Sequence, residues 1–233
     1  MLSRILLIRH GVTEMNEYLS TCPYGQPGFI DPGLYDTQLT RSGIMQASSV
    51  LRQRLATEHS RDRISTLICS PLSRALATAD LGLGDIDLPS YVIEPDIAER
   101  RYLSSDVGRS RDALACAYPR FASALMSTLP PNDPWWWVGS AEDEARAVAE
   151  RRALQGGGEL QGVALPVEPN DAFLRRIGRF RDRLVAMPGD STIAVVAHWG
   201  VILALTGESV RNCEVLECTR EQLMGELTLP PDD

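Results

Sequence analysis

The start of the chain contains a short apolar run that ends abruptly in charged and polar residues. Residues 5–8 read Ile-Leu-Leu-Ile, which is the length and composition of a buried strand, and Arg9, His10 and Gly11 follow. Packing alone does not favour an arginine and a histidine at such an end, because burying either group without a partner is costly. In open α/β sheets, ligands bind at the carboxyl ends of the strands. The sequence therefore predicts that Arg9 and His10 belong to a functional site.

The same pattern returns near the other end of the chain. Residues 192–197 form the most strongly apolar strand-like run, and His198, Trp199 and Gly200 follow it. The chain has three histidines, and the third, His59, closes a charged helical segment, where a solvated side chain is expected. We therefore take His198 as a second site residue and leave His59 aside.

Apolar runs and helical periodicities alternate along the rest of the chain. This alternation predicts an α/β fold, a three-layer α/β/α sandwich with a mostly parallel central sheet. We expect one domain over residues 1–233, with an inserted, cap-like segment at about 100–166 that includes Trp135, Trp136 and Trp137. The further expected strands are 65–69, 91–93 and 214–218; the expected helices are 41–59, 70–79, 112–129, 172–187 and 201–206; a loop is expected from 18 to about 35.

Composition excludes several function classes. The net charge of −8 argues against nucleic acid or an anionic membrane as the main partner, and no apolar run is long enough to span a bilayer. The five cysteines are scattered, and the first strand begins directly after the N-terminus, so we expect a cytoplasmic protein with reduced thiols. All 23 basic residues are arginines, which removes lysine Schiff-base chemistry and the P-loop lysine.

The remaining groups suit the transfer of a phosphoryl group, which needs charge neutralisation and an in-line nucleophile. Arg9 and Arg74, the latter in the first turn of the helix after the second strand, can each bind phosphate oxygens with a planar fork. The imidazole of His10 can act as the nucleophile if it is neutral, and adjacent guanidinium groups lower its pKa. Glu99, after the third strand, can donate a proton to the leaving group, and His198 can stabilise the transferring group.

Five ordered sequence blocks resemble the histidine phosphatase superfamily, also called the phosphoglycerate mutase-like family. The blocks are residues 9–16 (Arg-His-Gly-Val-Thr-Glu-Met-Asn), 36–40, 43–47, 70–79 (beginning Ser-Pro-Leu-Ser-Arg) and 196–198, and they cover nearly the whole chain. The resemblance implies a phosphoglycerate mutase-like fold. We expect no metal ion and no cofactor. It implies that His10 is the phosphorylated nucleophile, that Arg9, Arg74 and His198 complete the phosphate pocket, and that Glu99 is the proton donor.

The resemblance also implies a phosphate-binding role for Asn16, for which a simple helix cap is an equal alternative. Thr13 is expected to bind phosphate as well. For the acid, Asp106 is the alternative if Glu99 only pairs with a neighbouring arginine.

The block from Glu99 to Tyr102 is similar to a Glu-Arg-His-Tyr block of cofactor-dependent phosphoglycerate mutases, which implies that Arg100 and Tyr102 touch the substrate. However, Leu103 stands where those mutases have glycine, and residues 11–13 read Gly-Val-Thr where they have Gly-Glu-Ser. These departures favour the phosphatase branch.

The leading prediction is a phosphomonoester hydrolase that acts through phosphohistidine on a small phosphorylated metabolite. A cofactor-dependent phosphoglycerate or other sugar-phosphate mutase is the main alternative. A non-catalytic phospho-ligand binding protein ranks lower, because it predicts the loss of a core residue and all are present. A zinc hydrolase ranks lowest, since only two histidines are plausible ligands.

Overall fold

A computed structural model describes residues 4–58, 64–86, 88, 90–131, 167–188 and 192–229. Its centre is a five-stranded sheet in the order β3-β2-β4-β1-β5. The first four strands in this order run parallel, and β5 is antiparallel to β1. The strands are β1 (Ile5–Arg9), β2 (Ile64–Cys69), β3 (Ser90–Ile93), β4 (Thr192–Ala197) and β5 (Val215–Cys218).

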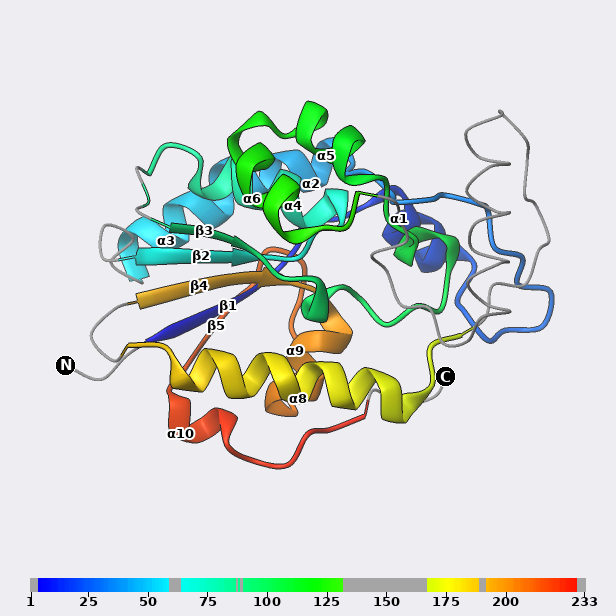
Figure 1. Ribbon diagram of the computed structural model, residues 1–233. Coiled ribbons are helices and arrows are strands. Elements are labelled where there is room, and N and C mark those ends of the chain that lie inside the picture. Colours follow the sequence, from blue (N-terminus) through cyan, green and yellow to red (C-terminus); the bar gives the residue numbers. More distant parts are fainter. Residues whose placement is uncertain are drawn as a thin grey trace.

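Helices cover both faces of the sheet. One layer contains α2 (Arg41–Met45), η1 (Gln46–Leu51), α3 (Arg52–Glu58), α4 (Ser73–Leu83), α5 (Arg111–Ala117), η5 (Pro119–Phe121) and α6 (Ala122–Thr128), and the opposite layer contains α8 (Asn170–Ala186), α9 (Trp199–Thr206) and α10 (Arg220–Leu223) (Figure 1). The helix α1 (Glu14–Thr21) and the short helices η3 (Pro95–Ile97) and η4 (Ser104–Asp106) lie in the loops that follow β1 and β3. The predicted three-layer α/β/α sandwich is confirmed.

Two hydrophobic cores sandwich the sheet, because successive strand side chains point to opposite faces. Leu6 and Ile8 of β1 pack in the core beneath α4, whereas Ile5 and Leu7 pack against α8 and α9. Every side chain of β4 is buried, as expected for the central strand of a sheet covered on both faces.

Three local predictions differ from the structure. The helix expected over 112–129 is divided into α5 and α6, because Pro119 has no N–H to continue the helical ladder and starts η5 instead. The loop expected from residue 18 begins later, because α1 continues to Thr21. The helix expected over 41–59 is interrupted by the π-helical η1, whose wider turn changes the helical register, and Val50 within it is exposed.

The described part of the expected insertion packs on the main core. Leu114 of α5 and Leu125 of α6 are fully buried in the same cluster as the side chains of α4. The rest of the insertion, 132–166 with Trp135–Trp137, lies outside the described residues, so its extent stays a prediction. No helix in the described ranges combines the length and the apolar character needed to cross a membrane.

The loop after β1 touches α2 backbone to backbone. A Cβ added to Gly43 would overlap the carbonyl oxygen of Val12, and one added to Gly11 would lie 2.8 Å from the carbonyl oxygen of Gly43. Glycine at both positions therefore allows the close approach that places the residues after β1.

We expect Gly43→Ala to lower the free energy of unfolding by about 2–3 kcal/mol, because the new methyl group would force these backbones apart. Urea unfolding monitored by circular dichroism measures the change. Gly178→Ala in α8 is the matched control: its nearest contact would be an ordinary 3.7 Å, and alanine favours a helix by up to about 1 kcal/mol. Equal stability of Gly43→Ala and the wild type would contradict the argument.

Candidate active site

The carboxyl ends of three neighbouring strands bring the predicted groups together. β1 ends in Arg9, and His10 follows directly. His198 comes directly after β4, and β2 leads into α4, whose second residue is Arg74. Glu99 arrives from the edge strand β3 through η3. This is the edge at which parallel sheets bind ligands, so the strand order explains the convergence.

A cavity of about 210 Å³ opens at this edge. Its lining residues are Arg9, His10, Met15, Asn16, Leu19, Tyr24, Arg74, Glu99, Arg100, Tyr102, Leu103, Ser105, Asp106, Trp199 and Gly200. His198 is fully buried beside it, with its ring centroid 5.2 Å from that of His10. The structure thus places seven of the nine predicted site residues on the cavity wall, His198 against them, and Thr13 elsewhere.

The ring of His10 is held in one tautomer. Its Nδ1 lies 2.8 Å from the carbonyl oxygen of Gly11, which can only accept, so Nδ1 carries the proton and Nε2 keeps a lone pair. Burial lowers the pKa of His10 well below its usual value, and the charges of Arg74 and Arg9 lower it further. The expected effect of the guanidinium groups on this pKa is present, and burial, which the sequence does not show, is the larger cause. The neutral ring has the protonation state that a nucleophile needs.

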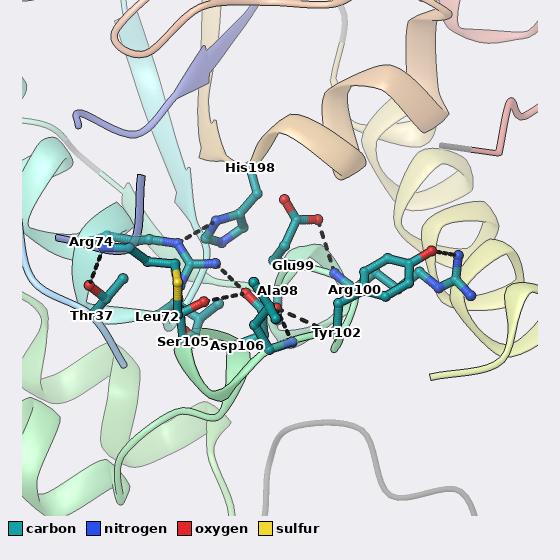
Figure 2. A network of polar contacts seen from close by, with 12 residues as sticks. Thr37, Leu72, Arg74, Ala98, Glu99, Arg100, Tyr102, Ser105, Asp106 and His198 are labelled. Carbon is teal, nitrogen blue, oxygen red and sulfur yellow. Dashed lines mark hydrogen bonds and ion pairs between the residues drawn. The ribbon is translucent and has the colours of Figure 1, made fainter. Parts of the chain in front are cut away.

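Arg74 connects several residues at the cavity through hydrogen bonds. Its guanidinium donates to His198 Nδ1 (3.2 Å), to the Ser105 carbonyl oxygen (2.6 Å) and to Asp106 Oδ1 (2.8 Å) (Figure 2). Because His198 Nδ1 accepts, its Nε2 carries the proton and donates to Ser70 Oγ at 2.7 Å. Burial and then the charge of Arg74 lower the pKa of His198, so this imidazole is also neutral. Arg9 also lines the cavity, and its Nη1 donates to the carbonyl oxygen of Val210.

The carboxyl group of Glu99 is fixed by two backbone donors. One oxygen accepts the N–H of Arg100 (3.0 Å; Figure 2) and the other accepts the N–H of Gly200 (3.1 Å). Burial raises the pKa of Glu99, and the nearby Asp106 raises it further, which favours the protonated form that a proton donor requires. A Cβ on Gly200 would lie 2.5 Å from the Glu99 carboxylate, so only glycine leaves room for this contact.

Asp106, the alternative acid, is already engaged. One oxygen accepts from Arg74, and the other accepts the N–H groups of Tyr102 (3.2 Å) and Leu103 (3.1 Å). One of its oxygens is therefore taken up by the guanidinium of Arg74, whereas the carboxyl group of Glu99 accepts from backbone amides. The arrangement therefore favours Glu99 over Asp106 as proton donor.

Asn16 and Thr13 form a reciprocal cap at the start of α1. Thr13 Oγ1 accepts the backbone N–H of Asn16, and Asn16 Oδ1 accepts the backbone N–H of Thr13, both at 3.1 Å. Asn16 also lines the cavity, so it combines the cap with a position suited to a ligand. Thr13 does not line the cavity, since its hydroxyl is used by the cap. The structure does not bring Thr13 to the phosphate pocket as we expected.

Arg100 and Tyr102 stand together on the outer wall. The Arg100 guanidinium lies over the Tyr102 ring, 4.3 Å from its centroid, and also donates to the Tyr102 hydroxyl. Next to them, the cavity is lined by apolar and aromatic side chains. These are Met15, Leu19, Tyr24, Leu103 and Trp199. These side chains offer apolar surface and rings against which a flat group could stack, with the Arg100 guanidinium beside them, and we call this part of the wall the outer cavity.

One supporting residue was missed by the sequence reasoning. Asn212 donates from Nδ2 to the carbonyl oxygen of His10 (2.9 Å) and to Asn16 Oδ1 (3.2 Å). It ties the nucleophile loop to the cap of α1. Asn212 lies just before β5, and only the antiparallel pairing of β5 with β1 brings it here. A lone asparagine in a loop carries no sequence signal of that role.

The zinc alternative requires a cluster of side chains that can ligate a metal ion. Within the described ranges, no three His, Cys, Asp or Glu side chains gather in a way that could hold a metal ion. Glu99 and Asp106, the carboxylates that line the cavity, are held by backbone amides and by Arg74.

Known proteins resemble this chain over most of its length. A model of the histidine phosphatase superfamily (branch 1) matches residues 5–155. The adenosylcobalamin/alpha-ribazole phosphatase of Salmonella typhi is 26% identical over 209 residues, which are 87% of this chain and 77% of the relative. The protein of that name from Escherichia coli K12 is 28% identical over 209 residues, covering 87% and 76%.

A solved structure of a putative alpha-ribazole-5'-P phosphatase from Escherichia coli K-12 shares the fold. It superposes with a TM-score of 0.54 at 24% identity, covering 97% of this chain and 96% of that one. The alpha-ribazole phosphatase from Shigella flexneri superposes with a TM-score of 0.53 at 23% identity, covering 97% and 95%.

The family match and the names of these phosphatase relatives bear out the predicted phosphomonoester hydrolase. The chain belongs to the histidine phosphatase superfamily.

Proposed function

We propose that the chain hydrolyses a small phosphorylated metabolite through a phosphohistidine formed at His10 Nε2. The single observation that carries this proposal is the hydrogen bond from His10 Nδ1 to the Gly11 carbonyl, which leaves Nε2 unprotonated in a cavity lined by Arg9 and Arg74. Arg9 and Arg74 hold the phosphoryl group, His198 orients Arg74 by accepting from its Nε, and the side chain of Asn16 lies at the cavity beside them.

The proposed reaction has two balanced steps. In the first, His10 Nε2 attacks phosphorus, the bond to the ester oxygen breaks, and Glu99 gives its proton to the departing oxygen. In the second, the Glu99 carboxylate takes a proton from water, the water oxygen attacks phosphorus, and the N–P bond breaks. Phosphate leaves, and His10 and Glu99 return to their starting protonation states.

The substrate we propose is an α-ribazole phosphate. Relatives that span most of the chain carry the name adenosylcobalamin/alpha-ribazole phosphatase. α-Ribazole has an aromatic base, and the outer cavity offers Tyr24, Tyr102 and Trp199 beside the phosphate pocket. Arg100 and Tyr102 would then contact the substrate outside its phosphate. We also propose that the protein acts in the cytoplasm, which agrees with five free cysteines.

The test compares α-ribazole 5'-phosphate, 3-phosphoglycerate and p-nitrophenyl phosphate, each with EDTA present. We expect phosphate release from every ester that binds. The kcat/KM for α-ribazole phosphate should be about 10-fold or more above the others, because its ribose and base can make more contacts with the outer cavity. Faster release from 3-phosphoglycerate would overturn the substrate but not the hydrolase. Conversion of 3-phosphoglycerate to its isomer without phosphate release would favour the mutase alternative, which the block from Glu99 to Tyr102 keeps in view.

A further inference from the structure

One buried arginine, Arg176 of α8, uses its whole guanidinium group within the protein. Its Nε and Nη2 donate to the two carboxylate oxygens of Glu168, both at 2.7 Å. Its Nη1 donates to the carbonyl oxygens of Asp96 and Ala98, both at 2.7 Å, and Nη2 also donates to that of Glu99 at 3.1 Å. A guanidinium has five N–H donors, so every one of them is used.

This pair differs from the other charges of its helix. Arg175, Arg179 and Arg183 lie on a solvated face of α8. Arg176 is only 7% exposed and Glu168 is fully buried. A buried ion pair is on balance a poor source of stability, because desolvating both charges costs about as much as their attraction returns. The contacts of the pair with the neighbouring backbone point to another role.

The backbone that Arg176 binds is the segment that carries Glu99. Between β3 and Glu99 the only regular structure is the single turn η3, so no sheet ladder sets the direction of this segment. Arg176 joins three of its carbonyl groups, including that of Glu99 itself. Glu168 extends the connection, because its own carbonyl oxygen accepts from Nε of Arg100 at 2.9 Å.

We propose that Arg176, held in place by Glu168, is a positioning residue that sets where the Glu99 carboxyl group stands relative to the leaving group. The inference rests on the proposed function, in which Glu99 donates the proton. Arg176 holds the backbone carbonyl of Glu99. The side chain of the same residue accepts from the N–H groups of Arg100 and Gly200 at the cavity. A shift of about 1 Å in a catalytic group can cost about 100-fold in rate.

The test uses two esters that differ in their need for a proton. p-Nitrophenolate leaves as an anion, whereas the alkoxide of an alkyl phosphate must be protonated. The variant Arg176→Lys keeps a positive charge opposite Glu168 but has only three N–H donors. For this variant we expect kcat/KM for the alkyl ester to fall about 10–100-fold. For p-nitrophenyl phosphate we expect a change of less than about 3-fold, because that step needs no positioned acid.

Arg179→Lys is the matched control. Arg179 lies on the same helix and pairs with the side chain of Asp96, but it is exposed and touches none of the three carbonyls. We expect both esters to react as in the wild type. Glu168→Gln serves as a second variant if Arg176→Lys does not fold. It should also lower kcat/KM for the alkyl ester relative to that for p-nitrophenyl phosphate, because an amide holds the guanidinium less firmly than a carboxylate.

Equal losses on both esters would show a merely structural role and overturn the inference, as would wild-type rates on both. Glu99→Gln is measured in parallel to separate this inference from the proposed function. If Glu99→Gln fails to discriminate between the esters, Glu99 is not the acid and the proposed function fails at that point. If Glu99→Gln discriminates and the Arg176 and Glu168 variants do not, only the positioning role is wrong.

Discussion

Replacing His10 by asparagine is expected to abolish phosphate release, lowering kcat/KM for p-nitrophenyl phosphate by about 10⁴-fold or more. The substitution removes Nε2, which is the proposed attacking atom, and leaves no other nucleophile at that place. The asparagine Nδ2 can still donate to the Gly11 carbonyl in place of the His10 Nδ1. The loss of that hydrogen bond therefore does not explain a loss of activity.

The assay is run with EDTA present, and acid quenching of the wild type during turnover should trap a phosphorylated protein that His10→Asn does not form. Calorimetric binding of inorganic phosphate controls for the pocket, because Arg9, Arg74 and His198 remain in the variant. Substantial turnover by His10→Asn would rule out the phosphohistidine. Loss of wild-type activity with EDTA would instead revive the metal-dependent alternative.

Replacing Glu99 by glutamine is expected to lower kcat/KM for an alkyl phosphate by about 10²–10⁴-fold, with a much smaller effect on p-nitrophenyl phosphate. The amide can keep one acceptor for the N–H groups of Arg100 and Gly200, but it has no acidic proton. The values of kcat/KM for the two esters measure the difference, because kcat/KM reports the steps up to departure of the leaving group and not the later attack of water, in which Glu99 also acts. Comparable losses on both would indicate that Glu99 supports the pocket and does not protonate the leaving group.

The pH dependence of the wild type follows from the same two groups. His10 must be neutral, and because its pKa is lowered, activity should be lost only at pH values well below the usual imidazole range. Glu99 must be protonated, and because its pKa is raised, activity on the alkyl ester should persist above the usual carboxyl range and fall as the pH rises through the raised value. With p-nitrophenyl phosphate, that fall at higher pH should be absent.

The sequence reasoning succeeded where the signal is local. An apolar run that ends in His10 or His198 identifies both a strand and a group at its carboxyl end, and the parallel sheet then brings those ends together. Arg74 could be placed for the same reason, since it stands in the first turn after a strand.

The residues that were missed act through long-range contacts. In the sequence Arg176 looks like the other arginines of its helix, and its burial depends on a segment 77 to 80 positions away. Gly200 is required because the Glu99 carboxylate rests on it, a contact across 101 positions. For Thr13 the sequence does not distinguish a helix cap from a phosphate ligand, because a hydroxyl suits both, and the structure shows the cap. Separate motifs do not show which of their residues will meet.

The late position of the central strand affects how the chain folds during synthesis. β1 and β2 do not pair with each other, because β4, from residues 192–197, lies between them. A growing chain on the ribosome therefore carries the unpaired hydrogen-bonding edges of both strands until most of the protein has been made. Such long-range pairing slows folding and exposes aggregation-prone edges. The yield of folded protein in cells should therefore depend most strongly on chaperones and temperature until β4, in the last fifth of the chain, has emerged.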